Sequence, residues 1–351
     1  MNRLDAGVRI EQFDATTDSA PLRACFEMTL AGWPVDRPGE PEWGFDAFAG
    51  KWAHGYDGAP RHTWLAIDDD HQPVGGYLLR LPDAENTSMA FCTMIVAPAA
   101  RRAGLGRALL AHCADQARRA GRLRLAGTAL DGSPGAAFAA ATGARCGIAE
   151  VVRVLTIDSA FPGRLSELRL AADKHSAGYS LLSWCTPAPD EYLDQLARIH
   201  GAMADAPHDA GVEPMVWDAA RIRHSEQTMA DHKLTGYAIA ARHDATGELV
   251  ALTEMVTEAD NPDWAFQQIT AVLPAHRGHR LGLLVKVAML ELLLTRAPTV
   301  RLVQTSNAGA NAHMIAINEQ LGFTVSGTGR DWELTIADDP AGAGSVVPAQ
   351  S

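Results

Sequence analysis

The sequence predicts an α/β fold with a mixed sheet, built from one unit that occurs twice. Two segments carry this prediction, IVAPAARRAGLGRALLAHCADQA from Ile95 and AVLPAHRGHRLGLLVKVAMLELL from Ala271. In each segment an apolar strand runs into a proline, a basic loop that contains glycine and a long apolar helix. A further strand, a short helix and a Gly-containing turn follow both segments. We therefore interpret them as two copies of one module.

The elements of the first copy follow from the hydrophobic periodicity and from the turn residues between the apolar runs. We predict strands over 8–13, 62–67, 74–81, 87–96, 123–127 and 151–157, and helices over 21–30, 44–51, 104–120 and 134–141. Antiparallel meander strands come first, and a strand, loop, helix, strand unit follows them. This order differs from the strict alternation of strands and helices in a doubly wound fold.

The second copy repeats the order of the first. We predict strands over 179–184, 235–241, 249–256, 265–272, 300–304 and 331–334, and helices over 189–203, 217–230, 281–294 and 310–320. The polar segment 161–176, with its early Pro-Gly, is the expected linker between an N-terminal domain, 1–160, and a C-terminal domain, 177–336. Residues 337–351 have the composition of a disordered tail.

Composition and charge exclude several classes of protein. The chain has 351 residues, 47% of them hydrophobic, which is enough for two cores. It lacks the roughly 18 uninterrupted apolar residues of a membrane span and the apolar core of a signal peptide. A net charge of −12 disfavours nucleic acid and mildly favours a cationic or amine substrate. We expect a cytoplasmic monomer or homodimer that binds neither membrane nor nucleic acid.

The five cysteines and the histidines do not indicate a metal site. The cysteines are odd in number and show no C-x-x-C spacing, so we expect reduced thiols without a zinc site or a disulfide framework. His276 and His279 are three positions apart in a loop without a third ligand. The sequence also lacks the complete phosphate-binding motifs of dinucleotide-binding folds and of P-loop proteins.

The first basic loop resembles a known cofactor loop. Arg101 to Gly106, RRAGLG, resembles the acyl-CoA loop [QR]-x-x-G-x-[GA] of the GNAT superfamily of N-acetyltransferases. The second loop is similar, with Arg277, Gly278 and Gly282 in place and Arg280 at the position of the middle glycine. Together the two copies cover nearly the whole chain, so the resemblance is to GNAT proteins with two tandem domains.

The resemblance implies two tandem GNAT folds with a splayed strand pair in each, and acetyl-CoA as the cofactor. The pyrophosphate would lie on backbone N–H groups at the start of a helix, where negative charge is favoured. The strand before the loop would pair with the pantetheine arm. The implied cofactor-binding residues are Ile95, Val96, Arg101, Arg102, Ala103, Gly104, Leu105 and Gly106 in the first half, and Ala271, Val272, Arg277, Gly278, His279, Arg280, Leu281, Gly282, Asn307 and Asn311 in the second.

The C-terminal half is the better catalytic candidate. Many members of the family have a tyrosine acid four positions before the turn glycine, where this chain has Ala139 in the first half and Asn318 in the second. We therefore take Asn318 and the strand residue Glu254 as candidate catalytic groups, with Glu254 as general base. Glu254 fits a solvated strand position equally well. The N-terminal half is expected to be non-catalytic, and its binding of acetyl-CoA is left open.

The function implied by the resemblance is transfer of an acetyl group from acetyl-CoA directly to a small-molecule amine. Two alternatives remain at this point: a protein or peptide N-acetyltransferase, and a pseudoenzyme that binds acyl-CoA as a sensor. The acidic segment with Asp205, Asp209 and Glu213 lies between the two early helices of the second half. Its acids are expected either to recognise a cationic amine at the C-terminal cleft or to form a solvated loop.

Overall fold

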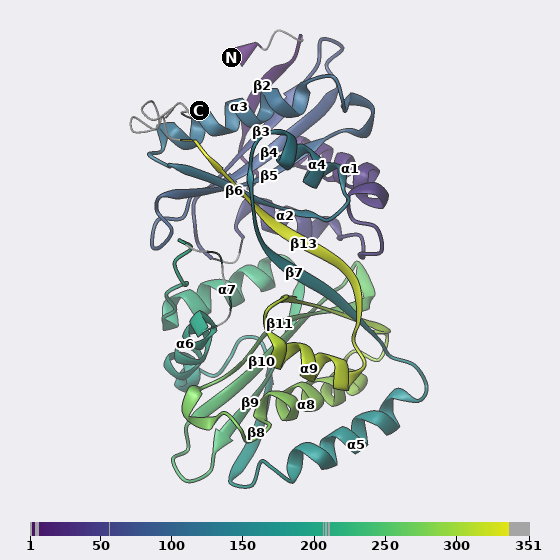
Figure 1. Ribbon diagram of the computed structural model, residues 1–351, viewed down its shortest axis with the longest axis vertical. Coiled ribbons are helices and arrows are strands. Elements are labelled where there is room, and N and C mark those ends of the chain that lie inside the picture. Colours follow the sequence, from purple (N-terminus) through teal and green to yellow (C-terminus); the bar gives the residue numbers. More distant parts are fainter. Residues whose placement is uncertain are drawn as a thin grey trace, which may run out of the picture.

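The computed structural model describes residues 2–3, 7–55, 57–205, 207, 209 and 211–336 (Figure 1). Its N-terminal strands are β1 (Asn2–Arg3), β2 (Arg9–Phe13), β3 (Arg61–Ile67), β4 (Pro73–Arg80), β5 (Met89–Val96), β6 (Arg124–Leu130) and β7 (Arg145–Thr156). The helices of this half are α1 (Ser19–Asp36), α2 (Phe45–Ala53), α3 (Leu105–Arg119) and α4 (Pro134–Ala141). The order predicted from the sequence is confirmed.

The C-terminal half repeats this order. Its strands are β8 (Tyr179–Cys185), β9 (Leu234–His243), β10 (Leu249–Glu258), β11 (Asn261–Val272), β12 (Leu302–Ala308) and β13 (Thr324–Thr335). Its helices are α5 (Phe161–Asp173), α6 (Leu193–Gly201), α7 (Ala219–Asp231), α8 (Leu281–Arg296) and α9 (Ala312–Leu321). No helix in the described part of the chain is both long and apolar enough to cross a bilayer.

The strands of both halves form one continuous mixed sheet. Among the described residues it has 13 strands, in the order β1-β2-β3-β4-β5-β6-β13-β7-β12-β11-β10-β9-β8. Most neighbours are antiparallel, and only β5 with β6 and β11 with β12 are parallel. The α/β fold class with two tandem units is thus confirmed.

The last strand of each half completes the sheet of the other half. β13, from the C-terminal half, pairs with β6 from Gly329↔Leu130 to Thr335↔Arg124. β7, from the N-terminal half, pairs with β12 from Leu302↔Thr156 to Ala308↔Glu150. Figure 1 shows β13 and β7 running side by side between the halves, and the two strands also pair with each other. The segments 1–160 and 177–336 are therefore interlocked, although the sequence suggested two separate units.

The segment 161–176 contains a helix, which corrects the expectation of a linker. Helix α5 buries Phe161, Leu165 and Ala172 in the C-terminal core, where Leu168 also packs. These residues recur at helical spacing, so one face of the segment is apolar although its overall composition is polar. The expected disordered tail, 337–351, lies outside the described residues.

Candidate functional site

Each half contains a parallel strand pair that separates after a few residues. β5 and β6 pair only from Met89↔Arg124 to Phe91↔Ala126. β11 and β12 pair only from Trp264↔Leu302 to Phe266↔Gln304. Beyond these pairs β5 and β11 continue, and the described strands leave the facing edge of each unpaired. An open strand edge can accept an extended chain through main-chain hydrogen bonds.

The loop after each fork has the same backbone shape in both halves. Arg102 (φ 67°) and Gly104 (φ 91°) are left-handed in the first loop, and Gly278 (φ 88°) and Arg280 (φ 54°) are left-handed in the second. The first loop thus has arginine and then glycine at its two left-handed positions, and the second loop has glycine and then arginine. The backbone conformation is the same in both. A Cβ atom at Gly104 or Gly278 would meet no atom within 4 Å, so both loops are open on the outside.

The helices that follow these loops begin without a side-chain cap. Neither α3 nor α8 has a side chain that accepts a hydrogen bond from its first turn. The first N–H groups of a helix have no partner within the helix, so they remain free for an anion. Both loops therefore fit a pyrophosphate.

The first arginine of each loop holds the loop against the rest of the protein. Nε of Arg101 and of Arg277 donates to the last carbonyl of the preceding strand, at 3.1 and 3.2 Å. Arg101 also forms an ion pair with Asp36 at 2.6 Å, and Arg277 forms one with Asp205 at 2.7 Å. These guanidinium contacts attach each loop to the preceding strand and to an acidic residue of a neighbouring segment.

Gly106 and Gly282 allow a second helix to approach. A Cβ atom at these positions would lie 3.2 Å from Phe138 of α4 and 3.2 Å from Ile317 of α9, respectively. The other predicted loop and strand residues divide by exposure. Ile95, Ala271, Leu105 and Leu281 are buried, Val96 and Val272 are half-buried at the strand ends, and Ala103 and His279 are exposed.

A β-bulge lies opposite Glu254 in the C-terminal half. The pairs Thr253↔Thr270 and Met255↔Gln267 leave one residue of β10, Glu254, opposite two residues of β11. The matching strands of the N-terminal half, β4 and β5, pair without such a shift. A bulge takes backbone groups out of the ladder and is common next to active sites. This asymmetry distinguishes the C-terminal fork from the N-terminal one.

The side chain of Gln267 fills the bulge. Its Nε2 donates to the Glu254 carbonyl at 2.6 Å, to Thr253 Oγ1 at 2.9 Å and to the Ile269 carbonyl at 3.1 Å. Its Oε1 is buried and has no partner among the described residues. A buried amide oxygen without a partner normally indicates a place for a water molecule or a ligand group. Sequence periodicity shows neither Gln267 nor the bulge.

Glu254 is paired with a histidine that the sequence did not suggest. Nε2 of His200, on α6, lies 3.4 Å from the Glu254 carboxylate. The His200 ring also packs against Trp217, with ring centroids 4.5 Å apart. Glu254 is half-buried, and its side chain is 26% exposed. His200 occupies an ordinary helix position, and only the fold brings it to Glu254.

The three predicted asparagines lie together but have different roles. Asn318 is fully buried, and its Nδ2 donates to Asn307 Oδ1 at 2.6 Å. Asn311 caps α9, accepting from the N–H of Met314 at 3.2 Å. Asn318 Oδ1 is buried without a partner among the described residues. Asn318 thus orients Asn307 from inside the protein and does not itself face the cleft.

The acidic segment before α7 lies elsewhere than expected. Asp205 pairs with Arg277 of the cofactor loop, as described above. Asp209 and Glu213 contact the N-terminal half, where they accept from the N–H groups of Ile148 and Asn86. These two acids are therefore neither a wall of the C-terminal cleft nor part of a free solvated loop. The described residues contain no group of His, Cys, Asp or Glu side chains suited to a metal ion.

Comparisons with known proteins agree with this geometry. Residues 22–143 match the acetyltransferase (GNAT) family. The solved tandem GNAT protein from the clavulanic acid biosynthesis pathway is similar at a TM-score of 0.77 and 28% identity, over 94% of this chain and 99% of that one. No curated protein matches the sequence.

Two more distant structures share the fold. A GCN5-related N-acetyltransferase from Sphaerobacter thermophilus has a TM-score of 0.69 at 17% identity, over 95% of this chain and 97% of that one. N-myristoyltransferase of Saccharomyces cerevisiae, solved with myristoyl-CoA, has a TM-score of 0.59 at 10% identity, over 95% and 81%. The GNAT fold binds acyl-CoA and supports acyl-CoA-dependent N-acyltransferase activity. With a forked strand pair and an open anion loop in each half, the structure consists of two tandem GNAT folds, and residues 22–143 match the GNAT family.

Proposed function

We propose that the protein is an acetyl-CoA-dependent N-acetyltransferase that acts on a small-molecule amine, with its chemistry in the C-terminal half. The observation that carries the proposal is the fork between β11 and β12. There the bulge in β11 lies opposite Glu254, which is paired with His200. The N-terminal fork has neither the bulge nor a matching pair of groups from these elements.

The residues of the C-terminal half fit acetyl-CoA. Its pyrophosphate would lie on the backbone N–H groups from Gly278 to Gly282, next to the uncapped start of α8. The pantetheine arm would pair with the open edge of β11 between Gln267 and Val272. When bound, acetyl-CoA supplies the activated acyl group. Arg280 belongs to this loop, and its exposed guanidinium would add a charge-assisted contact to a phosphate bound there.

Glu254 is the group that we propose to accept the proton of the incoming ammonium. Its carboxylate is partly exposed, and Nε2 of His200 lies 3.4 Å from it. The bulge leaves backbone groups of β11 outside the ladder, and an N–H there would stabilise negative charge on a carbonyl oxygen. Asn318 acts as a positioning residue, because its contact is with Asn307.

The surroundings of Glu254 favour a small acceptor. The ring of Trp217, just before α7, packs on His200 and so places a bulky aromatic group beside the partner of Glu254. A bound protein tail would need an open groove at this place, whereas a small amine needs only a short path to the fork. This contact supports a small amine over a protein or peptide tail as the acceptor.

The test is turnover of acetyl-CoA with a panel of small amines, measured as release of the CoA thiol. Glu254→Gln keeps the shape of the side chain and removes the base, so we expect kcat to fall by roughly 10²–10⁴. Glu248→Gln is the matched control, because Glu248 pairs with Arg198 on the surface of the same sheet. An unchanged kcat in Glu254→Gln would rule out this carboxylate as the base.

A second pair of variants tests which half works. Gly104→Asp and Gly278→Asp each place a carboxylate in one phosphate loop, at a left-handed position that aspartate tolerates. We expect Gly278→Asp to abolish turnover and Gly104→Asp to leave it near the wild-type rate. The opposite result would move the chemistry to the N-terminal half. Acetyl-CoA binding without turnover of any amine would support a sensor.

A further inference from the structure

The N-terminal fork opens onto a cavity that the C-terminal half helps to build. Its volume is about 240 Å³. Phe91 of β5 and Gly127 of β6 line it at the point where these strands separate. The opposite walls come from β13, through Asp331 and Trp332, and from the segment before α7, through Val212. Residues far apart in the sequence thus enclose one space.

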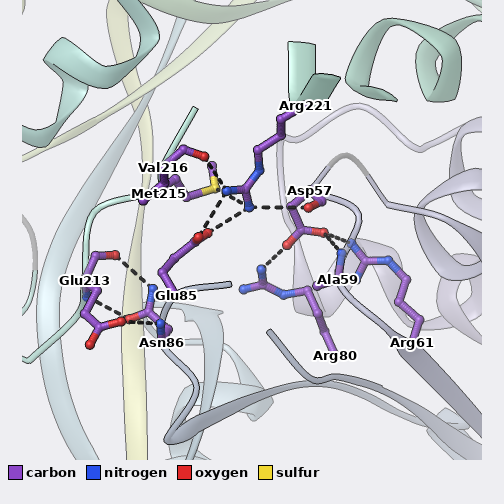
Figure 2. Close-up of polar contacts among 10 residues, drawn as sticks. All are labelled: Asp57, Ala59, Arg61, Arg80, Glu85, Asn86, Glu213, Met215, Val216 and Arg221. Carbon is purple, nitrogen blue, oxygen red and sulfur yellow. Dashed lines mark hydrogen bonds and ion pairs between the residues drawn. The ribbon is translucent and has the colours of Figure 1, made fainter. Parts of the chain in front are cut away.

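The segment before α7 is held firmly over this cavity. Asn86 exchanges three hydrogen bonds with Glu213: its N–H donates to Oε2 at 2.6 Å, its Nδ2 donates to the Glu213 carbonyl at 2.8 Å, and its Oδ1 accepts from the Glu213 N–H at 2.7 Å. Arg221 at the start of α7 forms a bidentate ion pair with Glu85, at 2.7 and 3.1 Å. Figure 2 shows both contacts side by side. Specific contacts with the N-terminal half therefore hold this wall of the cavity in place.

The cations around the cavity already have partners. Arg80 forms an ion pair with Asp57, which also binds Arg61, as Figure 2 shows. The Arg80 guanidinium also lies over the Phe91 ring, 4.0 Å from its centroid. Glu333, another lining residue, is held by two arginines, Arg124 at 3.2 Å and Arg145 at 3.3 Å. Each of these four arginines thus has a carboxylate partner within the protein, although two arginines share each carboxylate.

Two carboxylates that line the cavity lack such compensation. Asp331 accepts a hydrogen bond from Thr128 Oγ1 at 2.9 Å, and Asp209 accepts from the N–H of Ile148 at 3.0 Å. Within the described residues neither acid forms an ion pair with an arginine or a lysine. Burial, and the negative charge of nearby Asp209, raise the pKa of Asp331. A cation beside these two acids would relieve their repulsion.

The remaining walls are apolar or aromatic and define the size of a ligand. Met89, Phe91, Trp332 and Val212 contribute the apolar surface. Since one water molecule takes about 30 Å³ of the liquid, the cavity has the volume of about eight water molecules, which suits a small ligand. The Nε1 atom of Trp332 is buried and has no hydrogen-bond partner in the part of the chain that the structure describes. The space thus suits a compact molecule with one charged end.

We propose that this cavity is a binding site for a compact primary amine in its ammonium form. The ammonium group lies beside Asp331 and Asp209, and the apolar part of the ligand packs against Phe91, Trp332 and Val212. The site lies at the N-terminal fork, where β4 and β5 pair without a bulge and the described residues include no counterpart of the Glu254 pair. It goes beyond the C-terminal chemistry proposed above and does not depend on it.

Isothermal titration with benzylamine tests the site, with benzyl alcohol as the uncharged probe of the same shape. We expect the wild-type protein to bind benzylamine at least tenfold more tightly than benzyl alcohol. Asp331→Asn keeps the contact with Thr128 and removes the charge, so benzylamine should bind about tenfold more weakly while benzyl alcohol is unaffected. Asp131→Asn is the control, because Asp131 pairs with Arg330 at the surface near the same strand. Its affinities should equal those of the wild type.

A second variant keeps the test valid if Asp331→Asn does not fold. Val212→Phe fills the cavity without changing charge and should abolish binding of both probes. Glu254→Gln changes only the C-terminal cleft and should leave benzylamine binding intact. The proposal is overturned if the wild type does not bind benzylamine, if folded Asp331→Asn binds it as the wild type does, or if Glu254→Gln is the variant that loses it.

Discussion

The ion pair between Glu85 and Arg221 is predicted to hold the two halves together beyond the shared sheet. The pair is bidentate, and the side chains are only 8% and 14% exposed, respectively. Arg221 also donates to the carbonyls of Val216 and Asp57, at 2.6 and 3.3 Å. Glu85→Ala would leave the guanidinium largely buried with these two carbonyls and the Met215 sulfur, at 3.8 Å, as its neutral acceptors. Breaking a buried pair costs about 3–5 kcal/mol, and the retained carbonyls place the expected loss near the lower value.

A double-mutant cycle measures this coupling. We would record urea unfolding at pH 7 for the wild type, Glu85→Ala, Arg221→Ala and the double variant, and expect a coupling free energy of about 2–3 kcal/mol. The exposed pair Arg164 and Asp158, at 45% and 52% exposure, is the matched control and should give less than about 1 kcal/mol. A coupling for Glu85 and Arg221 no larger than that of the control would refute the reasoning.

Two further predictions concern single side chains of the C-terminal half. Lys286 is 1% exposed in α8, and burial lowers its pKa to about 7. The unfolded chain, with a lysine pKa near 10.4, binds the extra proton between about pH 7 and 10, so stability should rise with pH across this window. Lys286→Met should therefore stabilise the protein by roughly 3 kcal/mol at pH 7 and by much less near pH 10. Denaturant titrations at the two pH values measure this difference. An equal gain in stability at both pH values would contradict the prediction. Arg280→Gly removes a side chain from a left-handed position at φ 54°, so the free energy of unfolding should rise by about 0.5–1 kcal/mol. The affinity for CoA, measured by titration, should fall about tenfold because a phosphate contact is lost. An unchanged affinity would mean that Arg280 does not contact a phosphate.

The local patterns of the sequence predicted most elements and the position of both basic loops between a strand and a helix. Strand, proline, loop and helix follow each other within about two dozen residues of Ile95 and of Ala271, and short-range periodicity and turn chemistry are sufficient to identify them. The structure confirms the strands and helices that flank both loops. It also shows that Arg280 keeps the left-handed backbone of the middle glycine that it replaces, and that Gly278, two residues earlier, takes the left-handed position that Arg102 has in the first loop.

The helix α5 shows where composition misled the prediction. The segment is polar on average, but its few apolar residues lie on one face and pack into the C-terminal core. Averaging over the segment hides that face, whereas its spacing of three and four residues shows it. Asn318 is a related case: its position pointed to the cleft, and the structure buries it behind Asn307.

By itself the sequence determined the repeated unit, its loops and the asymmetry between Ala139 and Asn318, because these depend on neighbours along the chain. Only the tertiary structure decided the exchange of β7 and β13, the pairing of His200 with Glu254 and the contact of Glu213 with Asn86. A strand shows the same alternation whichever strand it pairs with. The sequence of an acidic segment likewise does not indicate which surface the segment covers. Such partners are selected by the packing of the whole chain, and in this protein they connect the two halves.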